Sequence, residues 1–199
     1  MRKLATNAFI TTMLAVPAHA NDYSDCGQFT DFALQISSCT RIIVSVDQAN
    51  HFIARNNRGT AFHQLGKYER AIEDFTAAIW LAPGYAEAYT NRGVTHAAQG
   101  KHDLAIADLS NAVKFNPGYA IGYNNRGNYY TGLGKHDLAI ADYSKAVELL
   151  PDYAQAYYRR GTAYAALGKT DEAKADIEKA HELDPTNYQA SIKSSPCRH

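Results

Sequence analysis

The sequence predicts an all-α solenoid of helix-turn-helix repeats, and three periodic features indicate it. An Arg-Gly pair recurs at a constant step of 34 residues: Arg58-Gly59, Arg92-Gly93, Arg126-Gly127 and Arg160-Gly161. A later Gly and a Pro keep the same step: Gly66, Gly100, Gly134 and Gly168, then Pro83, Pro117, Pro151 and Pro185. Two Ala series also keep it: Ala71, Ala105, Ala139 and Ala173, then Ala78, Ala112, Ala146 and Ala180. One helical pair cannot bury its own apolar face, so such units must stack on each other.

The first element, residues 1–20, reads as a signal peptide. Arg2 and Lys3 precede a mostly apolar stretch over 4–16, and Ala18-His19-Ala20 supplies the small residues that a signal peptidase needs. We expect cleavage after Ala20 and an exported protein, periplasmic if the source is bacterial. No later apolar run approaches the ~18 to 20 residues of a membrane span.

Residues 21–51 are expected to form an N-terminal segment and a capping helix. Apolar side chains recur at helical spacing on one face: Phe32, Ile36, Cys39, Ile43 and Val46. Such a helix would cover the apolar end of the stack. Because export permits disulfides, we expect Cys39 to bond Cys26 and pin an extended N-terminal segment onto this helix.

Cys197 is expected to be free or to pair between molecules. Four stacked helix pairs separate it from the N-terminal cap, roughly 30 to 40 Å if each pair advances ~10 Å. A disulfide needs Cα atoms within ~7 Å.

Four repeat units follow, over 52–85, 86–119, 120–153 and 154–187. In the second unit we expect helices over about 86–99 and 103–115, with Gly100 in the turn, where a positive φ costs little. Pro117 lies beyond the second helix, which it cannot continue. Residues 188–199 are expected to form a short C-terminal cap and a flexible tail.

The third unit reads Tyr123-x2-Arg126-Gly127-x2-Tyr130, then Ala139-x3-Tyr143, then Pro151. This pattern resembles the tetratricopeptide repeat, Trp-x2-Leu-Gly-x2-Tyr, Ala-x3-Phe and Pro. The resemblance covers 136 of 199 residues and departs from the family in one systematic way, because Arg stands where Leu is usual. It implies a right-handed superhelix, with the first helix of each pair lining a concave surface that binds protein.

The predicted partner-binding groove lies on these first helices, at i, i+3, i+4 and i+7 spacing. Its candidate residues are Asn56, Asn57, Thr60, Asn91, Val94, Asn124, Asn125, Asn128, Tyr158 and Arg159. An amide carries both a donor and an acceptor, so it can pair with a peptide backbone of any sequence. The alternative interpretation is an ordinary polar helix surface. Some family members grip a C-terminal carboxylate with Lys and Arg, but here only Arg159 matches in charge, so we expect a largely neutral, extended ligand.

The Arg of each unit is predicted to pair with a repeated Asp. Asp74, Asp108, Asp142 and Asp176 follow the same step as Arg58, Arg92, Arg126 and Arg160. Arg58 and Asp74 lie at one height on antiparallel helices, and Asp74 and Arg92 do too. We therefore expect a ladder of alternating charges in which each Asp faces an Arg on both sides.

Composition and motifs argue against other functions. The formal net charge is zero, so nothing points to a nucleic-acid partner. His102 and His136 occupy equivalent positions about 10 Å apart, whereas zinc ligands lie about 2 Å from one centre. The sequence contains neither a glycine-rich phosphate loop nor a Gly-x-Ser-x-Gly elbow. We expect no cofactor, no metal and no catalysis.

The predicted function is a non-catalytic scaffold that binds a protein or peptide outside the cytoplasm. Two alternatives stay open. One is a structural homo-oligomer whose repeat faces stack, and the other is an enzyme or small-ligand sensor with a site grafted on the solenoid. The partner, the pathway and the oligomeric state are not readable from the sequence.

Overall fold

The computed structural model describes residues 18–45 and 48–188, and this part of the chain contains ten helices and no strand. The helices are α1 (Ala20–Gly27), α2 (Phe32–Ile43), α3 (His51–Gln64), α4 (Tyr68–Leu81), α5 (Ala86–Ala98), α6 (His102–Phe115), α7 (Ala120–Gly132), α8 (His136–Leu149), α9 (Ala154–Ala166) and α10 (Thr170–Leu183). Most of the predicted signal peptide, together with Val46, Cys197 and the predicted tail from residue 189, lies outside the described residues.

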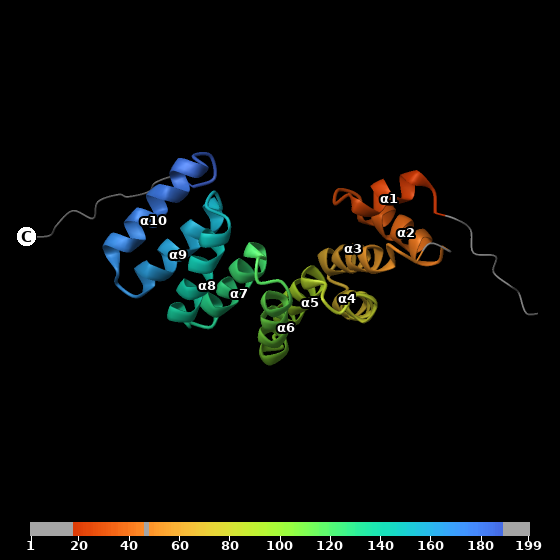
Figure 1. The fold of residues 1–199 in the computed structure, drawn as a ribbon, viewed down its shortest axis with the longest axis horizontal. Helices are drawn as coiled ribbons and strands as arrows, with labels where there is room; N and C mark the ends of the chain where they lie inside the picture. Colours follow the sequence, from red (N-terminus) through yellow and green to blue (C-terminus); the bar gives the residue numbers. More distant parts are fainter. Residues whose placement is uncertain (1–17, 46–47, 189–199) are drawn as a thin grey trace, which may run out of the picture.

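Helices α3 to α10 form four stacked pairs, and Figure 1 shows them as an arc in chain order. First helices of neighbouring repeats pack on one another, α3 with α5, α5 with α7 and α7 with α9. Second helices stay farther apart, because no Cα atoms of α4 and α6, or of α6 and α8, lie within 8 Å. Since helices on the inside of a curved stack approach more closely, α3, α5, α7 and α9 line the concave side. The expected all-α solenoid is confirmed.

The turn inside each repeat depends on a glycine in the left-handed region, with φ between 69° and 73° at Gly66, Gly100, Gly134 and Gly168. At Gly100 the chain reverses with two capping bonds, from the Gly100 N–H to the Ala97 carbonyl and from the Lys101 N–H to the His96 carbonyl, both 2.9 Å. A side chain at this φ would be strained, so glycine sets where α5 ends and α6 begins.

A second glycine in each repeat brings the paired helices together. A Cβ atom on Gly127 would lie 2.8 Å from Tyr143 Cε1 and 3.2 Å from the Ala139 carbonyl oxygen. Ala139 and Ala146 are fully buried between α8 and its neighbours. The repeated small residues therefore mark where backbones approach, as the periodic Gly and Ala predict.

The N-terminal segment differs from the expectation, because it is helical rather than extended. Helix α1 packs against α2 and α3, and the Cys26–Cys39 disulfide joins α1 to α2 with a Cα–Cα distance of 4.8 Å. The pair α1–α2 therefore takes the position of a preceding repeat. An isolated helix of eight residues is unstable in water, so α1 depends on this disulfide and on packing.

The face of α2 that is buried also differs from the predicted face. Its buried residues are Gln35, Ser38, Cys39 and Ile42, whereas Phe32, Ile36 and Ile43 are half-buried. The reason is that α2 packs between α1 and α3, and the Gln35 amide bridges them. It donates to the carbonyl oxygens of Cys26 at 3.3 Å and Asn57 at 3.2 Å.

The Arg–Asp pairs form within each repeat, as predicted. Each guanidinium engages both oxygens of one carboxylate: Arg58 with Asp74 at 2.8 and 2.8 Å, Arg92 with Asp108 at 2.8 and 2.8 Å, Arg126 with Asp142 at 2.8 and 2.7 Å, and Arg160 with Asp176 at 2.7 and 2.8 Å. The carboxylates are buried, and their hydrogen bonds raise the pKa of Arg92, Arg126 and Arg160.

Between repeats the predicted alternation of charges is wrong. Each Arg donates instead to a hydroxyl oxygen of the preceding helix pair: Arg58 to Thr40 at 2.9 Å, Arg92 to Thr76 at 3.0 Å, Arg126 to Ser110 at 3.3 Å and Arg160 to Ser144 at 3.1 Å. In α4, α6 and α8 this hydroxyl lies two residues after the Asp, about 200° around the helix. Asp74 thus faces its own first helix, whereas Thr76 faces the next.

Candidate binding surface

The predicted groove residues lie on the concave first helices, but they differ in exposure. Asn56 and Asn124 are 6% and 2% exposed and form part of the floor. Asn57 and Asn125 are half-buried, and their amides have no hydrogen-bond partner among the described residues. Val94 and Tyr158 are exposed. Three depressions interrupt this surface. One lies between α3 and α5, one lies between α7 and α9, and one lies where Ile53 and Asn57 of α3 meet α1 and α2.

The depression between α3 and α5 has a volume of about 110 Å³. Its lining residues are Thr60, His63, Gln64, Phe75, Asn91 and Val94. The Asn91 amide donates to Asn56 Oδ1 at 2.9 Å, and His63 Nδ1 bonds the Thr95 hydroxyl at 2.9 Å. The amides of Asn91 and Asn56 are therefore already hydrogen-bonded to each other between helices. Burial lowers the pKa of His63, so this imidazole is uncharged at neutral pH.

The depression between α7 and α9 is larger, about 340 Å³. Its lining residues are Asn128, Thr131, Tyr143, Gln155, Tyr158, Arg159, Thr162 and Tyr188. The Arg159 guanidinium donates to Asn128 Oδ1, which holds the cation at the edge of the depression. The rings of Tyr158 and Tyr188 lie 5.0 Å apart and form an aromatic wall.

The floor of this depression is polar as well. The Tyr143 hydroxyl bonds the Thr131 hydroxyl at 3.1 Å, and burial raises the pKa of Tyr143. Next to the depression, the Asn124 amide donates to Oε1 of the lining residue Gln155 at 3.3 Å, whereas the buried Asn124 Oδ1 has no partner among the described residues. The surface therefore offers one cation, neutral donors and acceptors, and aromatic faces.

Sequence reasoning missed Thr131, Tyr143 and Tyr188 as members of the site. Tyr143 stands on the second helix of its repeat, where the equivalent residues are Phe75, Leu109 and Ile177. In the sequence, the hydroxyl of Tyr143 at a position that is apolar in the other three repeats could have indicated a role in the site. Tyr188 follows the last Pro, so only the fold places it beside Tyr158.

Within 18–45 and 48–188, no three His, Cys, Asp or Glu side chains are grouped so that they could hold a metal ion. None of the helices in these ranges is both long and apolar enough to cross a membrane.

Comparison with protein families identifies the repeat. A model described as "TPR repeat" matches residues 59–100 and 127–168, and a model described as "Tetratricopeptide repeat" matches 86–119 and 154–187. Together the two models cover residues 59–119 and 127–187, more than half of the chain. The chain belongs to the tetratricopeptide repeat (TPR) family.

Solved structures share the TPR architecture. A crystal structure of MamA is 29% identical, covers 78% of this chain and 90% of its own, and superposes with a TM-score of 0.65. TTC0263 of Thermus thermophilus, a thermophilic TPR protein at 24% identity, covers 80% and 86% with a TM-score of 0.66. The first TPR of Spaghetti (RPAP3), bound to the HSP90 peptide SRMEEVD, is 37% identical over 53% of this chain and 84% of its own, with a TM-score of 0.51. No curated protein matches the sequence.

Proposed function

We propose that this TPR protein is a non-catalytic scaffold that binds an extended polypeptide along the concave surface of α3, α5, α7 and α9, outside the cytoplasm. The observation that carries the proposal is that the amides of Asn57 and Asn125, on first helices, have no hydrogen-bond partner among the described residues; Asn57 also lines a depression beside Ile53. The peptide complex of the Spaghetti (RPAP3) TPR supports a peptide as the kind of ligand.

The chemistry of the surface favours a ligand with little charge. Asn57 and Asn125 present amides that can pair with a peptide unit of any sequence. Exposed Ile53, Val94 and Ile121 add apolar contact beside them. Among the described residues, Arg159 is the one cation that lines any of the three depressions, and it is already held by Asn128.

Selection from an unbiased peptide library displayed on phage tests the proposal, with synthetic copies of the selected peptides measured by calorimetry. We expect Asn125→Ala to weaken binding about 3- to 10-fold and Asn57→Ala/Asn125→Ala to weaken it more than 10-fold, because each lost hydrogen bond contributes about 1 kcal/mol. Lys114→Ala, on the exposed outer surface of α6, is the matched control and should bind as the parent does. If the double variant keeps the parent affinity with unchanged helicity, the concave surface is not the binding site.

Export is tested by the N-terminus of the protein recovered from its native cell. We expect Asn21 as the first residue of the mature chain. Cleavage there removes the His19 amide that donates to Asp22 at 3.0 Å, but it keeps the Asp22–Arg41 pair at 2.5 Å. A full-length chain in the cytoplasmic fraction would contradict the proposal.

A further inference from the structure

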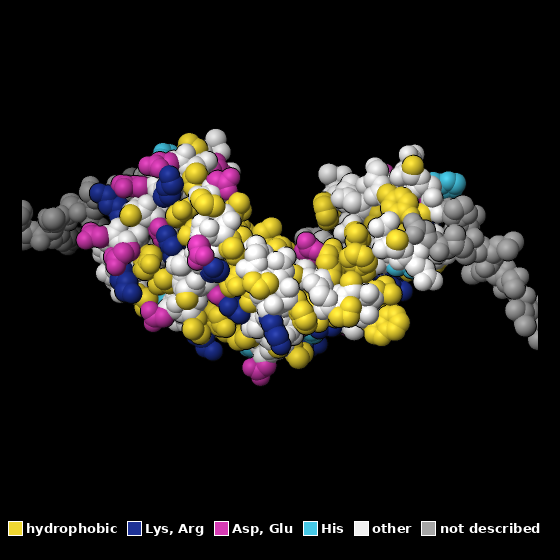
Figure 2. All heavy atoms as spheres, in the orientation of Figure 1, with side chains coloured by type: hydrophobic (Ala, Val, Ile, Leu, Met, Phe, Trp, Pro, Cys, Tyr) yellow, Lys and Arg dark blue, Asp and Glu magenta, His cyan; other side chains and the backbone are white. Residues whose placement is uncertain are grey.

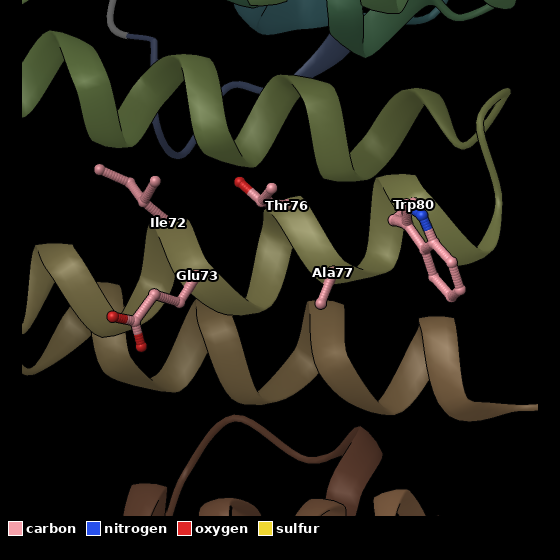
Figure 3. A pocket seen from close by; sticks show the side chains of 5 residues that line it. All are labelled: Ile72, Glu73, Thr76, Ala77 and Trp80. Atoms are coloured by element: carbon pink, nitrogen blue, oxygen red, sulfur yellow. The ribbon is translucent and has the colours of Figure 1, made fainter.

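The outer face of α4 carries an apolar surface that the concave groove does not explain. Trp80, the single tryptophan of the chain, is 80% exposed. It borders a shallow, open depression of about 500 Å³ whose other lining residues are Ile72, Glu73, Thr76 and Ala77. Figure 3 shows Trp80 at the C-terminal end of this surface and Ile72 and Glu73 at the other end.

At two positions of this face the other three repeats carry polar side chains. The positions of Ala77 and Trp80 are taken by Asn111 and Lys114 in the second repeat, Lys145 and Glu148 in the third, and Lys179 and Glu182 in the fourth. The last two are ion pairs, at 2.5 and 3.0 Å. Figure 2 shows the same contrast, with charged side chains gathered over the C-terminal helices and few over α3 and α4. Ala77 and Trp80 are therefore a departure of one repeat, whereas Ile72 recurs as Ile106 and Ile140.

The polar groups on this face are arranged so that it complements itself. Glu73 and Trp80 are seven residues apart, which places them on one side of α4 about two turns from each other. A two-fold axis across α4 between Thr76 and Ala77 exchanges them. This axis brings the Trp80 Nε1–H of one copy to the Glu73 carboxylate of the other copy. Within one copy, neither the indole N–H nor the carboxylate has a hydrogen-bond partner among the described residues.

The residues at the crossing point allow the two helices to approach. Thr76 and Ala77 are small, so each indole can lie over the depression of the opposite copy. The charge pattern permits this pairing, because Glu73 is the single charged residue lining the depression and faces an N–H donor instead of a like charge.

We propose that a second copy of this chain covers the face, through an antiparallel contact of two α4 helices about a two-fold axis at Thr76 and Ala77. One helix face per copy is smaller than the surface of about 800 Å² per partner that a stable interface buries, so the dimer is weak and depends on concentration. The contact leaves the concave side open, so it is independent of peptide binding.

Light scattering and the emission of Trp80 test the proposal from about 1 µM to about 1 mM protein. We expect the mass to rise from monomer to dimer while the emission shifts to shorter wavelength, because the single indole becomes buried. Ala77→Lys/Trp80→Glu, which installs the Lys–Glu pair of the third and fourth repeats, should weaken association at least 10-fold. Leu138→Glu is the control, since Leu138 is a 50% exposed leucine on α8 and should not affect the dimer.

A crosslinking experiment tests the position of the axis. In a Cys197→Ser background, Ala77→Cys should form a disulfide between two copies, because its Cα atoms meet within about 7 Å at the axis. Asn111→Cys, the equivalent position of the second repeat, should not. A monomer with constant emission up to about 1 mM overturns the proposal, as does a dimer that forms equally well in the Ala77→Lys/Trp80→Glu variant.

Discussion

The arginine that precedes the glycine in each first helix contacts more than one neighbour. Arg126 engages both oxygens of Asp142, bonds Ser110 of the preceding repeat, and lies with its guanidinium carbon 5.8 Å from the centre of the Tyr123 ring. Tyr123 occupies the position of the family's Trp, so the ring and the cation interact where the family has an aromatic residue and a leucine. The substitution of Leu by Arg therefore connects the repeats through polar bonds.

Replacing this arginine should destabilise the fold. Arg126→Leu should lower the free energy of unfolding by about 3 kcal/mol or more, because it leaves the buried Asp142 without its cation. Urea denaturation followed by circular dichroism measures the change. Ser110→Ala removes only the link between repeats and should cost about 1 kcal/mol. Arg126→Leu/Asp142→Asn removes the unpaired charge and should recover most of the loss. A double variant no more stable than Arg126→Leu would show that the charge pair is not the cause.

Two histidines make stability depend on pH. Burial lowers the pKa of His63 and His96 below the ordinary value of 6.5, and near His96 the charge of Asp108 opposes this, whereas Arg92 and Lys101 reinforce it. Because the folded state binds these protons less well than the unfolded state, their contribution is complete above pH 6.5 and declines as the pH falls through the lower folded values. We expect lower urea midpoints at about pH 5 than at about pH 7.5. Most carboxylates are still ionised at about pH 5, so the histidines account for the difference. His63→Gln/His96→Gln should flatten this dependence.

At the scale of one element, two of the three glycines of helix α7, Gly127 and Gly132, have opposite roles. At Gly127 an added Cβ would meet Tyr143 Cε1 at 2.8 Å, whereas at Gly132 it would meet nothing within 4 Å. Gly127→Ala should therefore destabilise the protein by about 1 to 3 kcal/mol through overpacking. Gly132→Ala should stabilise it by up to about 1 kcal/mol, because alanine loses less backbone entropy in a helix. Thermal unfolding of the two variants compares them, and equal effects would contradict the close approach of α7 and α8.

The pair α1–α2 depends on its disulfide in a way that the repeats do not. Cys26→Ser/Cys39→Ser should cost about 2 to 4 kcal/mol, as expected for opening a loop of this length. Hydrogen exchange of backbone amides should show the loss in α1 and α2, with smaller effects toward α9 and α10, because each repeat contacts only its neighbours. Uniform loss of protection along the array would instead indicate one cooperative unit.

Among the described residues, most charged side chains are paired between helices or placed on outer surfaces. The concave surface carries few charges, chiefly Arg159 and the exposed Glu87 at the position equivalent to Ile53. We therefore expect the affinity for a selected neutral peptide to change less than about 3-fold between about 0.05 and 0.5 M NaCl, because few charges are screened on binding. Calorimetry at several salt concentrations measures this. A steep loss of affinity with salt would indicate that Arg159 and an acidic ligand dominate recognition.

The sequence by itself determined the number of repeats, the two helices of the second repeat within one residue, and the pairing of Arg58 with Asp74 and its equivalents. These features follow from local periodicity, since residues 16 apart across a fixed turn meet in every copy. Tertiary structure alone decided that Thr76 and its equivalents bond the next Arg, that Tyr143 and Tyr188 join the groove, and that α1 is helical. The physical reason is that a period describes what the repeats share. How each side chain points, and which neighbours the superhelix brings to it, depend on the packing of helices far apart in the chain.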